Sequence, residues 1–308
     1  MKPTATFVAL ALAATFGIAS SGQQPIRVGV DLVHFAVVVT DRRGVPIGGL
    51  TLDDFEVLER GKPQQVKFFA AADAASAPPL HLGFLLDASG SMEADIRDVR
   101  SAAIKFLNQN DHAVDVTLVD FDTEVRVARY AADDYPRLIE RIRMRKPGGY
   151  TAFYDALGVY LRGASTQDGQ KILVAYTDGG DTRSSINAGE VSDLLKSSDV
   201  TMYALGYLQG HTTASRNSAQ LELQRFSGMT GGQAFFPSSP KELDALYEKI
   251  RQEIAARYTL GYVSSDERSD GSWRPVEIKL KRPDLKGVKL RTRPGYFAPA
   301  GPGPVVPR

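Results

Sequence analysis

Between Leu80 and Arg257, short apolar runs alternate with stretches of helical periodicity, and this alternation limits the possible folds more than any other feature of the chain. Apolar runs bounded by polar residues predict strands at 82–86, 114–119, 172–176, 200–205 and 234–236. Between them, apolar side chains recur every three or four residues, most clearly at 96–107 and 243–254. Apolar strands separated by helices are typical of a parallel sheet covered on both faces. The sequence therefore predicts an α/β fold with a doubly wound, mostly parallel, Rossmann-like sheet over 80–257.

Strand-like sequence lies on both sides of this region. Residues 27–70 contain strand candidates at 28–40, 55–58 and 66–69, and residues 258–293 contain candidates at 258–263, 273–280 and 288–291. Three strands alone would be marginally stable, whereas two packed halves bury both apolar faces. We therefore expect one β-sandwich, formed by 27–70 and 258–293, into which the α/β domain is inserted. A linker rich in alanine and proline is expected at 71–79, and a disordered tail rich in proline and glycine at 294–308.

The N-terminus has the pattern of a secretory signal peptide over residues 1–22. Lys2 precedes an apolar run from Phe7 to Ala19, and small residues then lead into polar sequence. The run is shorter than the ~20 residues that a membrane-spanning helix needs. The prediction is an exported protein that is periplasmic, on the cell surface or secreted. Membrane contact is expected only if the signal stays uncleaved.

Composition excludes several partners and site types. A net charge of +1 gives no field that would attract nucleic acid or an anionic membrane. The chain has no cysteine, which excludes disulfides, thiolate metal sites and a lipid-modified cysteine. The mature protein must therefore depend on its apolar core for stability.

The most informative motif follows the first predicted strand of the α/β region, where Asp87, Ser89 and Ser91 stand at alternate positions of a loop. Loops at the carboxyl ends of parallel strands form the ligand crevice of open α/β sheets. This loop offers only oxygen donors, which suit hard cations such as Mg²⁺, Mn²⁺ or Ca²⁺. Two further loops add donors of the same kind, a hydroxyl at Thr151 and a carboxylate at Asp178.

Together these residues resemble the metal-ion-dependent adhesion site of von Willebrand factor A domains. The order Asp87-x-Ser89-x-Ser91, then Thr151, then Asp178 matches at all five positions, and the resemblance covers roughly Leu80 to Tyr258. Tyr150, between Gly149 and Thr151, is a departure, because many relatives pass directly from glycine to threonine. The flanking sequences are similar to bacterial VWFA-related exported proteins of the kind abundant in Acidobacteria. They comprise Asp54-Phe55-Glu56-Val57, Gly61-Lys62 and Arg293-Pro294-Gly295-Tyr296.

The resemblance implies a role for each site residue. Ser89, Ser91 and Thr151 would be direct ligands of one divalent cation, Mg²⁺ first and Mn²⁺ or Ca²⁺ as alternatives. Asp87 and Asp178 would act through ordered water, and an open coordination position would take an Asp or Glu carboxylate from a protein or matrix partner. A metal ion that is not bonded directly to a carboxylate stays electrophilic and favours such a group.

Other interpretations of these acidic and hydroxyl residues stay open on sequence alone. Asp-x-Ser-x-Ser at a helix start is also a common N-cap. Asp181 and Asp155 could accept hydrogen bonds around the metal site, although turn and first-turn helix positions suit them better. Asp120 and Asp122 are interpreted as loop carboxylates near the same edge.

The same motifs favour a binding protein over an enzyme. Ala88-Ser89-Gly90-Ser91 lacks the nucleophile elbow of hydrolases, and no phosphate-binding Gly-Lys-Ser/Thr loop is present. The four histidines, at 34, 81, 112 and 211, show no recognisable partner spacing. The expected function is a metal-dependent adhesion or protein-binding module. The alternatives are a cell-envelope scaffold that binds through its β-sandwich and, more remotely, a metal-dependent hydrolase.

Overall fold

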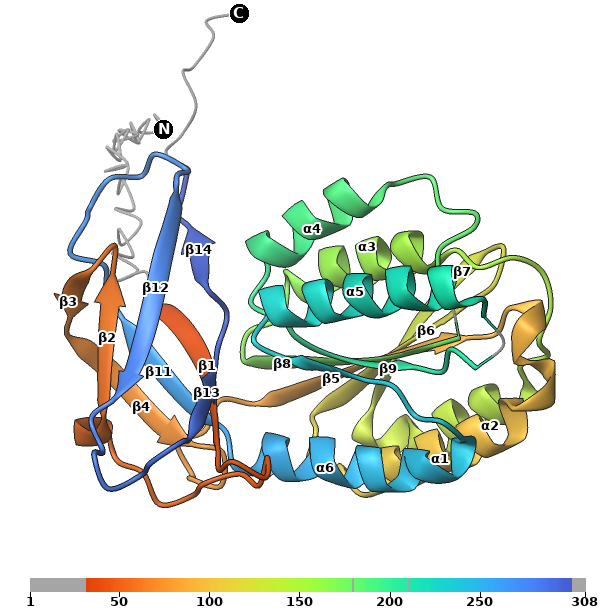
Figure 1. Ribbon diagram of the computed structural model, residues 1–308, viewed down its shortest axis with the longest axis horizontal. Helices are drawn as coiled ribbons and strands as arrows, with labels where there is room; N and C mark the ends of the chain where they lie inside the picture. Colours follow the sequence, from red (N-terminus) through yellow and green to blue (C-terminus); the bar gives the residue numbers. More distant parts are fainter. Residues whose placement is uncertain (1–31, 179, 210, 301–308) are drawn as a thin grey trace, which may run out of the picture. The chain divides into compact units, whose positions relative to one another are not determined.

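The central element is a six-stranded sheet in the order β10-β9-β8-β5-β6-β7. All neighbouring strands are parallel except β7, which is antiparallel to β6. The computed structural model describes residues 32–178, 180–209 and 211–300 (Figure 1). The strands are β5 (Leu80–Asp87), β6 (Asp115–Phe121), β7 (Val125–Ala131), β8 (Gln170–Thr177), β9 (Thr201–Gly206) and β10 (Gln233–Phe235). This is the doubly wound, mostly parallel α/β fold that the sequence predicts.

Helices cover both faces of this sheet, and each face has its own apolar core (Figure 1). One face packs against α1 (Ile96–Asn108), α2 (Tyr135–Met144) and α6 (Leu243–Ala255). The other face packs against α3 (Phe153–Ala164), α4 (Ala188–Ser197) and α5 (Thr213–Met229). Short 3₁₀ turns precede several elements, at Leu52–Asp54, Gly90–Ala94, Ala132–Asp134 and Pro240–Glu242.

Strand β5 lies between β8 and β6 in the middle of the sheet, and every one of its residues is buried. Successive side chains of a strand point to opposite faces, so Phe84 joins one core and Leu85 joins the other. A strand that is buried on both faces needs a continuous run of apolar residues, which is why β5 could be predicted from the sequence. Asp87 is its last residue and stands at the carboxyl edge of the sheet.

Two four-stranded antiparallel sheets form a sandwich from both flanks of the α/β domain. The first has the order β13-β1-β11-β4 and the second the order β14-β12-β2-β3. The N-terminal flank supplies β1 (Val33–Thr40), β2 (Phe55–Glu59), β3 (Lys62–Gln64) and β4 (Val66–Ala71). The C-terminal flank supplies β11 (Tyr258–Tyr262), β12 (Trp273–Leu280), β13 (Lys289–Arg291) and β14 (Gly295–Phe297). Both sheets contribute side chains to one shared apolar core, which includes Phe35, Val57, Leu260 and Ile278.

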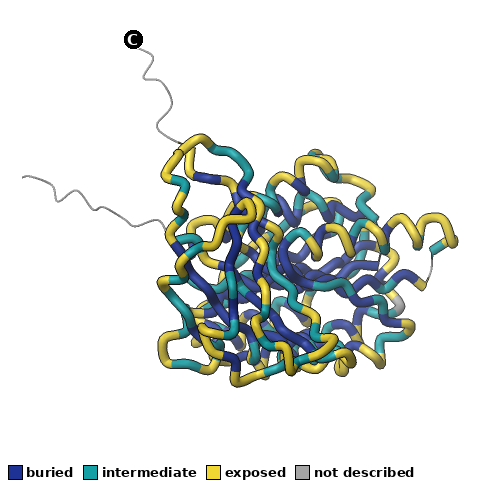
Figure 2. The backbone as a smooth tube through the Cα atoms, turned by 60° about the vertical axis from the view of Figure 1, so that its left-hand side comes forward, coloured by how far each residue is buried: buried dark blue, intermediate teal, exposed yellow. Residues whose placement is uncertain are grey.

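Figure 2 shows how burial follows this plan, with buried backbone along the sheet strands and exposed residues on outer loops and helix faces. The described residues, from Leu32 to Ala300, belong to one compact unit. Among the described residues, no helix has the length and apolar character to cross a membrane. The predicted signal peptide, residues 1–22, lies outside the described residues.

The structure differs from the sequence prediction at three strands. Strand β7 was not predicted, and neither was β3, which lies between the strands predicted at 55–58 and 66–69. Strand β14 lies inside the segment that was expected to be disordered, where its residues pair with Trp273, Arg274 and Pro275 of β12. The disorder prediction for 294–308 is therefore wrong at 295–297, and residues 301–308 are outside the described part. The linker predicted at 71–79 begins one residue later in the structure, because Ala71 is the last residue of β4.

Candidate metal centre

The loop after β5 holds three of the five predicted ligands in one short stretch. The Asp87 side chain is fully buried, and its Oδ1 accepts a hydrogen bond of 2.9 Å from the backbone N–H of Ser89. Ser89 is also buried, whereas Ser91 is exposed. The two hydroxyl oxygens lie 3.1 Å apart. Ser89 occupies the N-cap position of the 3₁₀ turn that follows, but its side chain makes no capping hydrogen bond. Helix capping therefore does not account for the Ser89 hydroxyl.

Thr151 reaches the same edge through a second loop that is hydrogen-bonded to the first. The Gly148 N–H donates to the Ala88 carbonyl at 2.9 Å, and the Gly90 N–H donates to the Gly149 carbonyl at 3.2 Å. Gly149 has φ +77°, and a Cβ there would lie 2.4 Å from Thr123 Oγ1. Only glycine suits this backbone and this approach. The backbone turn at Gly149 thus accommodates the additional Tyr150, whose side chain is 64% exposed.

Asp178 follows the last residue of β8 and completes the group from a third loop. Thr177 donates its hydroxyl to Asp87 Oδ2 at 2.8 Å, so the end of β8 is bonded directly to the end of β5. The Ser91 hydroxyl donates to the Asp178 carboxylate, which is itself largely buried. The Thr151 N–H donates to Thr182 Oγ1 at 2.9 Å, which ties the second and third loops together. All three predicted loops therefore meet at one edge of the sheet.

Electrostatics at this edge are dominated by two acidic groups with little compensation. Burial, and then the negative charge of Asp178, raise the pKa of Asp87 to about 6, although hydrogen bonds from Ser89 and Thr177 act in the opposite direction. Burial also raises the pKa of Asp178 above its ordinary value. Among the described residues, no lysine or arginine forms an ion pair with either carboxylate. Two carboxylates at close quarters without a cation destabilise the charged state of the site.

The donor set combines hydroxyls with only two carboxylates. Within the described ranges, no three His, Cys, Asp or Glu side chains converge as a metal-binding group. A cation here would depend on Ser89, Ser91 and Thr151 for a large part of its coordination. Oxygen donors of this kind suit Mg²⁺, Mn²⁺ or Ca²⁺ and do not suit zinc.

The other acidic residues have structural partners. Asp120 lies within β6, buried, with Arg141 Nη2 at 2.5 Å and Arg145 Nε at 3.1 Å, so its interpretation as a loop carboxylate is wrong. Asp122 pairs with Arg126 and Arg145. Both aspartates are neutralised by arginine, unlike Asp87.

Asp155 and Asp181 hold loop backbone in place. Asp155 accepts hydrogen bonds from the N–H groups of Ser185 and Ile186 at 2.9 and 3.2 Å. Asp181 accepts from the N–H groups of Tyr154 and Ser184, each at 3.1 Å. These contacts agree with the turn and first-turn positions that the sequence suggested, and they shape the loop that carries Thr151.

Sequence reasoning missed three residues at this edge, namely Thr177, Thr182 and His211. The His211 ring contacts the main-chain oxygen of Asp178 through Nε2. His211 lies on the loop after β9, which ends at the same edge of the sheet. Loops that follow parallel strands meet at one edge of the sheet, so the loop after β9 could have been expected there from the sequence. No sequence signal indicates which of its residues would reach Asp178.

A doubly wound sheet whose carboxyl edge gathers hydroxyl and carboxylate side chains defines a class of α/β ligand-binding domains. Within that class, the family model of the von Willebrand factor type A domain matches residues 81–249, which is more than half of the chain. The chain therefore belongs to the von Willebrand factor type A domain family. A comparison with curated protein sequences gave no match.

Solved structures with similar folds come from several bacteria. The PilB minor pilin from Streptococcus sanguinis has 13% identity and a TM-score of 0.49, over 59% of this chain and 63% of that chain. The vWF domain of the type V pili tip protein Mfa5 from Porphyromonas gingivalis has 14% identity and a TM-score of 0.49, over 58% and 96%. A von Willebrand factor type A protein from Catenulispora acidiphila has 12% identity and a TM-score of 0.49, over 81% and 74%. This chain spans less than two thirds of the PilB chain, and at these identities the structures define neither a function nor a partner for it.

Proposed function

We propose that this protein binds one divalent cation, Mg²⁺ or alternatively Mn²⁺ or Ca²⁺, at Asp87, Ser89, Ser91, Thr151 and Asp178. We propose further that it uses the cation to capture a carboxylate of a protein or matrix partner, as a binding module and not as an enzyme. The supporting observation is the fully buried Asp87 carboxylate, which lies beside Asp178 without an ion-paired cation among the described residues. A divalent ion would neutralise both charges.

The spacing of the two serine hydroxyls supports the same proposal. Oxygens at neighbouring corners of an octahedron around Mg²⁺, with bonds of about 2.1 Å, lie about 3.0 Å apart. Ser89 Oγ and Ser91 Oγ are 3.1 Å apart. Their separation therefore suits two direct ligands of a single ion.

The two aspartates suit positions around the cation in which they act through water and do not bond the metal directly. Both oxygens of Asp87 already accept hydrogen bonds from protein groups, the Ser89 N–H and the Thr177 hydroxyl. An acceptor held in this way can orient water and supply charge without bonding the metal. The bound cation would act as a Lewis acid that takes the partner's carboxylate at its open position, while the hydroxyls and aspartates fix where it stands.

We also propose that the protein is exported and meets its partner in the cell envelope or outside the cell. The supporting observation is the signal-like sequence of residues 1–22. The finer resemblance to VWFA-related exported proteins is consistent with this location. The partner would be a protein or matrix component with an accessible Asp or Glu side chain.

Cation binding is tested most cleanly with Ser91→Ala, because Ser91 is exposed and its loss leaves the core intact. We expect the affinity for Mg²⁺, measured by isothermal titration calorimetry, to fall by at least about tenfold. Ser185→Ala is the matched control, since this exposed serine lies on a neighbouring loop and uses only its backbone N–H in a hydrogen bond. Equal affinities of the wild-type protein and Ser91→Ala would contradict the proposed ligand set.

Partner capture is tested separately with immobilised protein and envelope extract. Capture should require Mg²⁺, be reversed by a chelator and be competed by a large excess of acetate. Ser91→Ala should lose the same partner that Ser185→Ala retains. A partner that resists the chelator would instead favour a scaffold that binds through the β-sandwich.

A further inference from the structure

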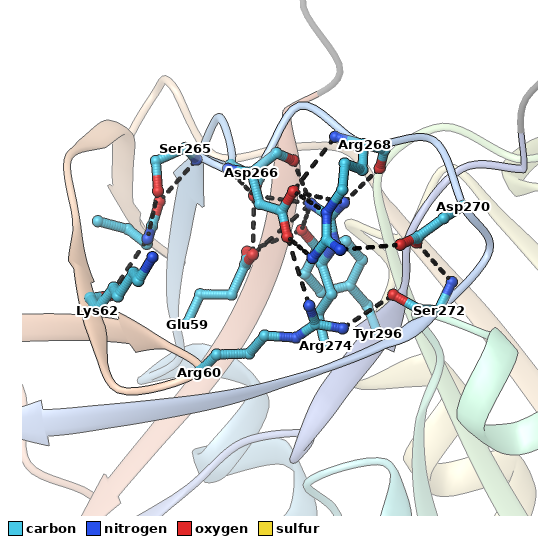
Figure 3. Close-up of polar contacts among 12 residues, drawn as sticks. Glu59, Arg60, Lys62, Ser265, Asp266, Arg268, Asp270, Ser272, Arg274 and Tyr296 are labelled. Carbon is cyan, nitrogen blue, oxygen red and sulfur yellow. Dashed lines mark hydrogen bonds and ion pairs between the residues drawn. The ribbon is translucent and has the colours of Figure 1, made fainter.

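Two arginines are almost completely buried within the described part of the chain, and their surroundings differ. Arg274 of β12 is 2% exposed and Arg257, between α6 and β11, is 1% exposed. Figure 3 shows Arg274 among acidic and hydroxyl groups. Its guanidinium lies 3.6 Å from Glu59 Oε1 and 3.8 Å from Asp266 Oδ1. The positive charge of Arg274 is therefore compensated inside the fold.

Arg257 has no such compensation. Among the described residues, no carboxylate lies within 4 Å of its guanidinium, and its Nε forms no hydrogen bond with the protein. Nη1 donates to Thr201 Oγ1 at 3.4 Å and Nη2 donates to Gln170 Oε1. Burial lowers the pKa of Arg257 to about 10, so the group stays charged at neutral pH. A buried charge without a counter-charge is strongly unfavourable, so the burial of Arg257 requires an explanation.

A cavity of about 500 Å³ lies against Arg257, a volume typical of small-molecule sites. Hydrogen-bond donors from several strands line it together with the guanidinium, namely Gln170, Lys171, Thr201, Thr259 and His34. The acidic residues on its wall are Asp168, which is exposed, and Asp199. Asp199 is occupied by Lys171, whose Nζ lies 2.5 Å from Asp199 Oδ2.

The surrounding charges also favour an anion. Arg293 lies outside the lining itself but donates to the carbonyl of His34, a lining residue, at 2.7 Å and to the Ser198 carbonyl at 3.1 Å. Burial lowers the pKa of His34, and the positive charges of Arg293 and Lys171 lower it further against the opposing effect of Asp199. With Lys171 paired to Asp199, Arg257 is the buried charge without an ion pair on the described lining of the cavity, and the remaining charge there, that of Asp168, is exposed.

We propose that this cavity binds a small oxyanion, with the guanidinium of Arg257 as its main counter-charge. A carboxylate, phosphate or sulfate group would accept hydrogen bonds from the planar guanidinium fork, as such groups do elsewhere. The Thr201 and Thr259 hydroxyls and the Gln170 amide would supply further contacts. The anion is a single charged group of a small molecule, because the cavity is too small for a folded partner.

This site is separate from the candidate cation site. Gln170 and Thr177 are the first and last residues of β8, so the two sites lie at opposite ends of one strand, about 23 Å apart. The inference does not depend on the metal. Its test is therefore made with protein freed of metal by chelation followed by dialysis.

The experiment compares thermal unfolding of the full chain in phosphate and in chloride at equal ionic strength. Low millimolar phosphate should raise the Tm of the wild-type protein in a saturable way. Arg257→Met should lose this rise, bind phosphate at least tenfold more weakly, and unfold in chloride at a Tm equal to or above that of the wild-type protein. Arg274→Met is the matched control. It should unfold at a lower Tm in both salts, because Glu59 loses its partner, yet keep the phosphate-dependent rise.

Two outcomes would overturn the proposal. In the first, the wild-type protein shows neither a phosphate-specific rise in Tm nor heat of phosphate binding in calorimetry, a measurement that does not depend on any variant folding. In the second, Arg257→Met keeps the rise.

Discussion

At the scale of single residues, Asp87 is a buried charge whose position destabilises the metal-free fold. Its side chain is completely buried at the end of the central strand, next to a second carboxylate. An apolar residue would pack there without electrostatic cost. If the protein binds a cation there as proposed, the free energy of binding would include the relief of this unfavourable burial.

The raised pKa of Asp87 predicts a pH dependence for the metal-free protein. The group prefers to be protonated in the fold, so its contribution to stability is complete below its ordinary pKa of 3.8 and is lost as the pH rises through about 6. The loss amounts to about 3 kcal/mol in the free energy of unfolding. Asp178, whose pKa is raised as well, changes stability in the same direction. Chemical denaturation of chelator-treated protein between pH 4 and 8 measures this effect.

Asp87→Asn removes the charge but keeps polar atoms for Ser89 and Thr177. We expect this variant to be more stable than the metal-free wild-type protein at pH 7.5 and to show a weaker pH dependence between 4 and 7. It should also gain no stability from Mg²⁺, whereas the wild-type protein should. A variant that is destabilised at neutral pH would show that the buried charge is compensated by groups that this interpretation overlooks.

The site was predictable from sequence to the extent that its residues follow predicted strands. Asp87 and Asp178 each end a strongly apolar run, and the edge of a parallel sheet brings such ends together. The hydrogen bond from Thr177 to Asp87 and the contact of His211 with Asp178 were not predictable. Both depend on side-chain directions in three dimensions, and neither residue type has a spacing that marks it.

At the scale of elements, the central strand depends on a glycine that lets a helix approach. A Cβ at Gly83 of β5 would lie 2.1 Å from Tyr160 Cε2 on α3, whose ring is buried. The Gly83→Ala variant should therefore displace α3 from the strand that ends in Asp87. We expect a loss of about 3 kcal/mol or more in the free energy of unfolding, at the upper end of overpacking effects.

Gly163 provides the matched control on the same helix. It is exposed near the end of α3, and a Cβ there would meet no atom within 4 Å. Gly163→Ala should stabilise the protein by about 0.5–1 kcal/mol, because alanine is the better helix former. Urea denaturation of the two variants tests both expectations. Equal effects of the two substitutions would mean that the contact of Tyr160 with β5 does not limit the packing.

The strands that the sequence prediction missed all lie at an edge of their sheets. The apolar pattern of β7 is interrupted by Arg126 and Arg129, and every residue of this edge strand except Tyr130 is exposed or half-buried. Strands β3 and β14 have three residues each, and both contain or adjoin proline and glycine. Such short strands exist because a neighbour is already in place to pair with them. Central strands such as β5 and β8 were predicted because burial on both faces requires a continuous apolar run.

At the scale of the whole chain, the sandwich joins sequence segments from both sides of the α/β domain. Strand β11 pairs with both β1 and β4, and β12 pairs with β2, so each sheet contains strands from both flanks. The buried Glu59 adds a polar link. It accepts hydrogen bonds from Tyr262 at 2.8 Å and from Tyr296 at 2.9 Å, and it lies 3.6 Å from Arg274. The α/β domain is therefore connected at both of its ends to the same β-sandwich.

This closure predicts that the segment after Arg293 contributes to stability although its composition suggests disorder. Tyr296 is 6% exposed, packs in the sandwich core and donates to Glu59. A chain that ends at Arg293 loses β14 and should lose at least about 3 kcal/mol in the free energy of unfolding, the cost of deleting one large buried aromatic side chain. Tyr296→Phe should lose only about 1 kcal/mol, because it removes one hydrogen bond and keeps the ring. A chain that ends at Ala300 retains β14 and serves as the control. If truncation at Arg293 and at Ala300 gave the same denaturation midpoint, β14 would add nothing to the closure of the sandwich.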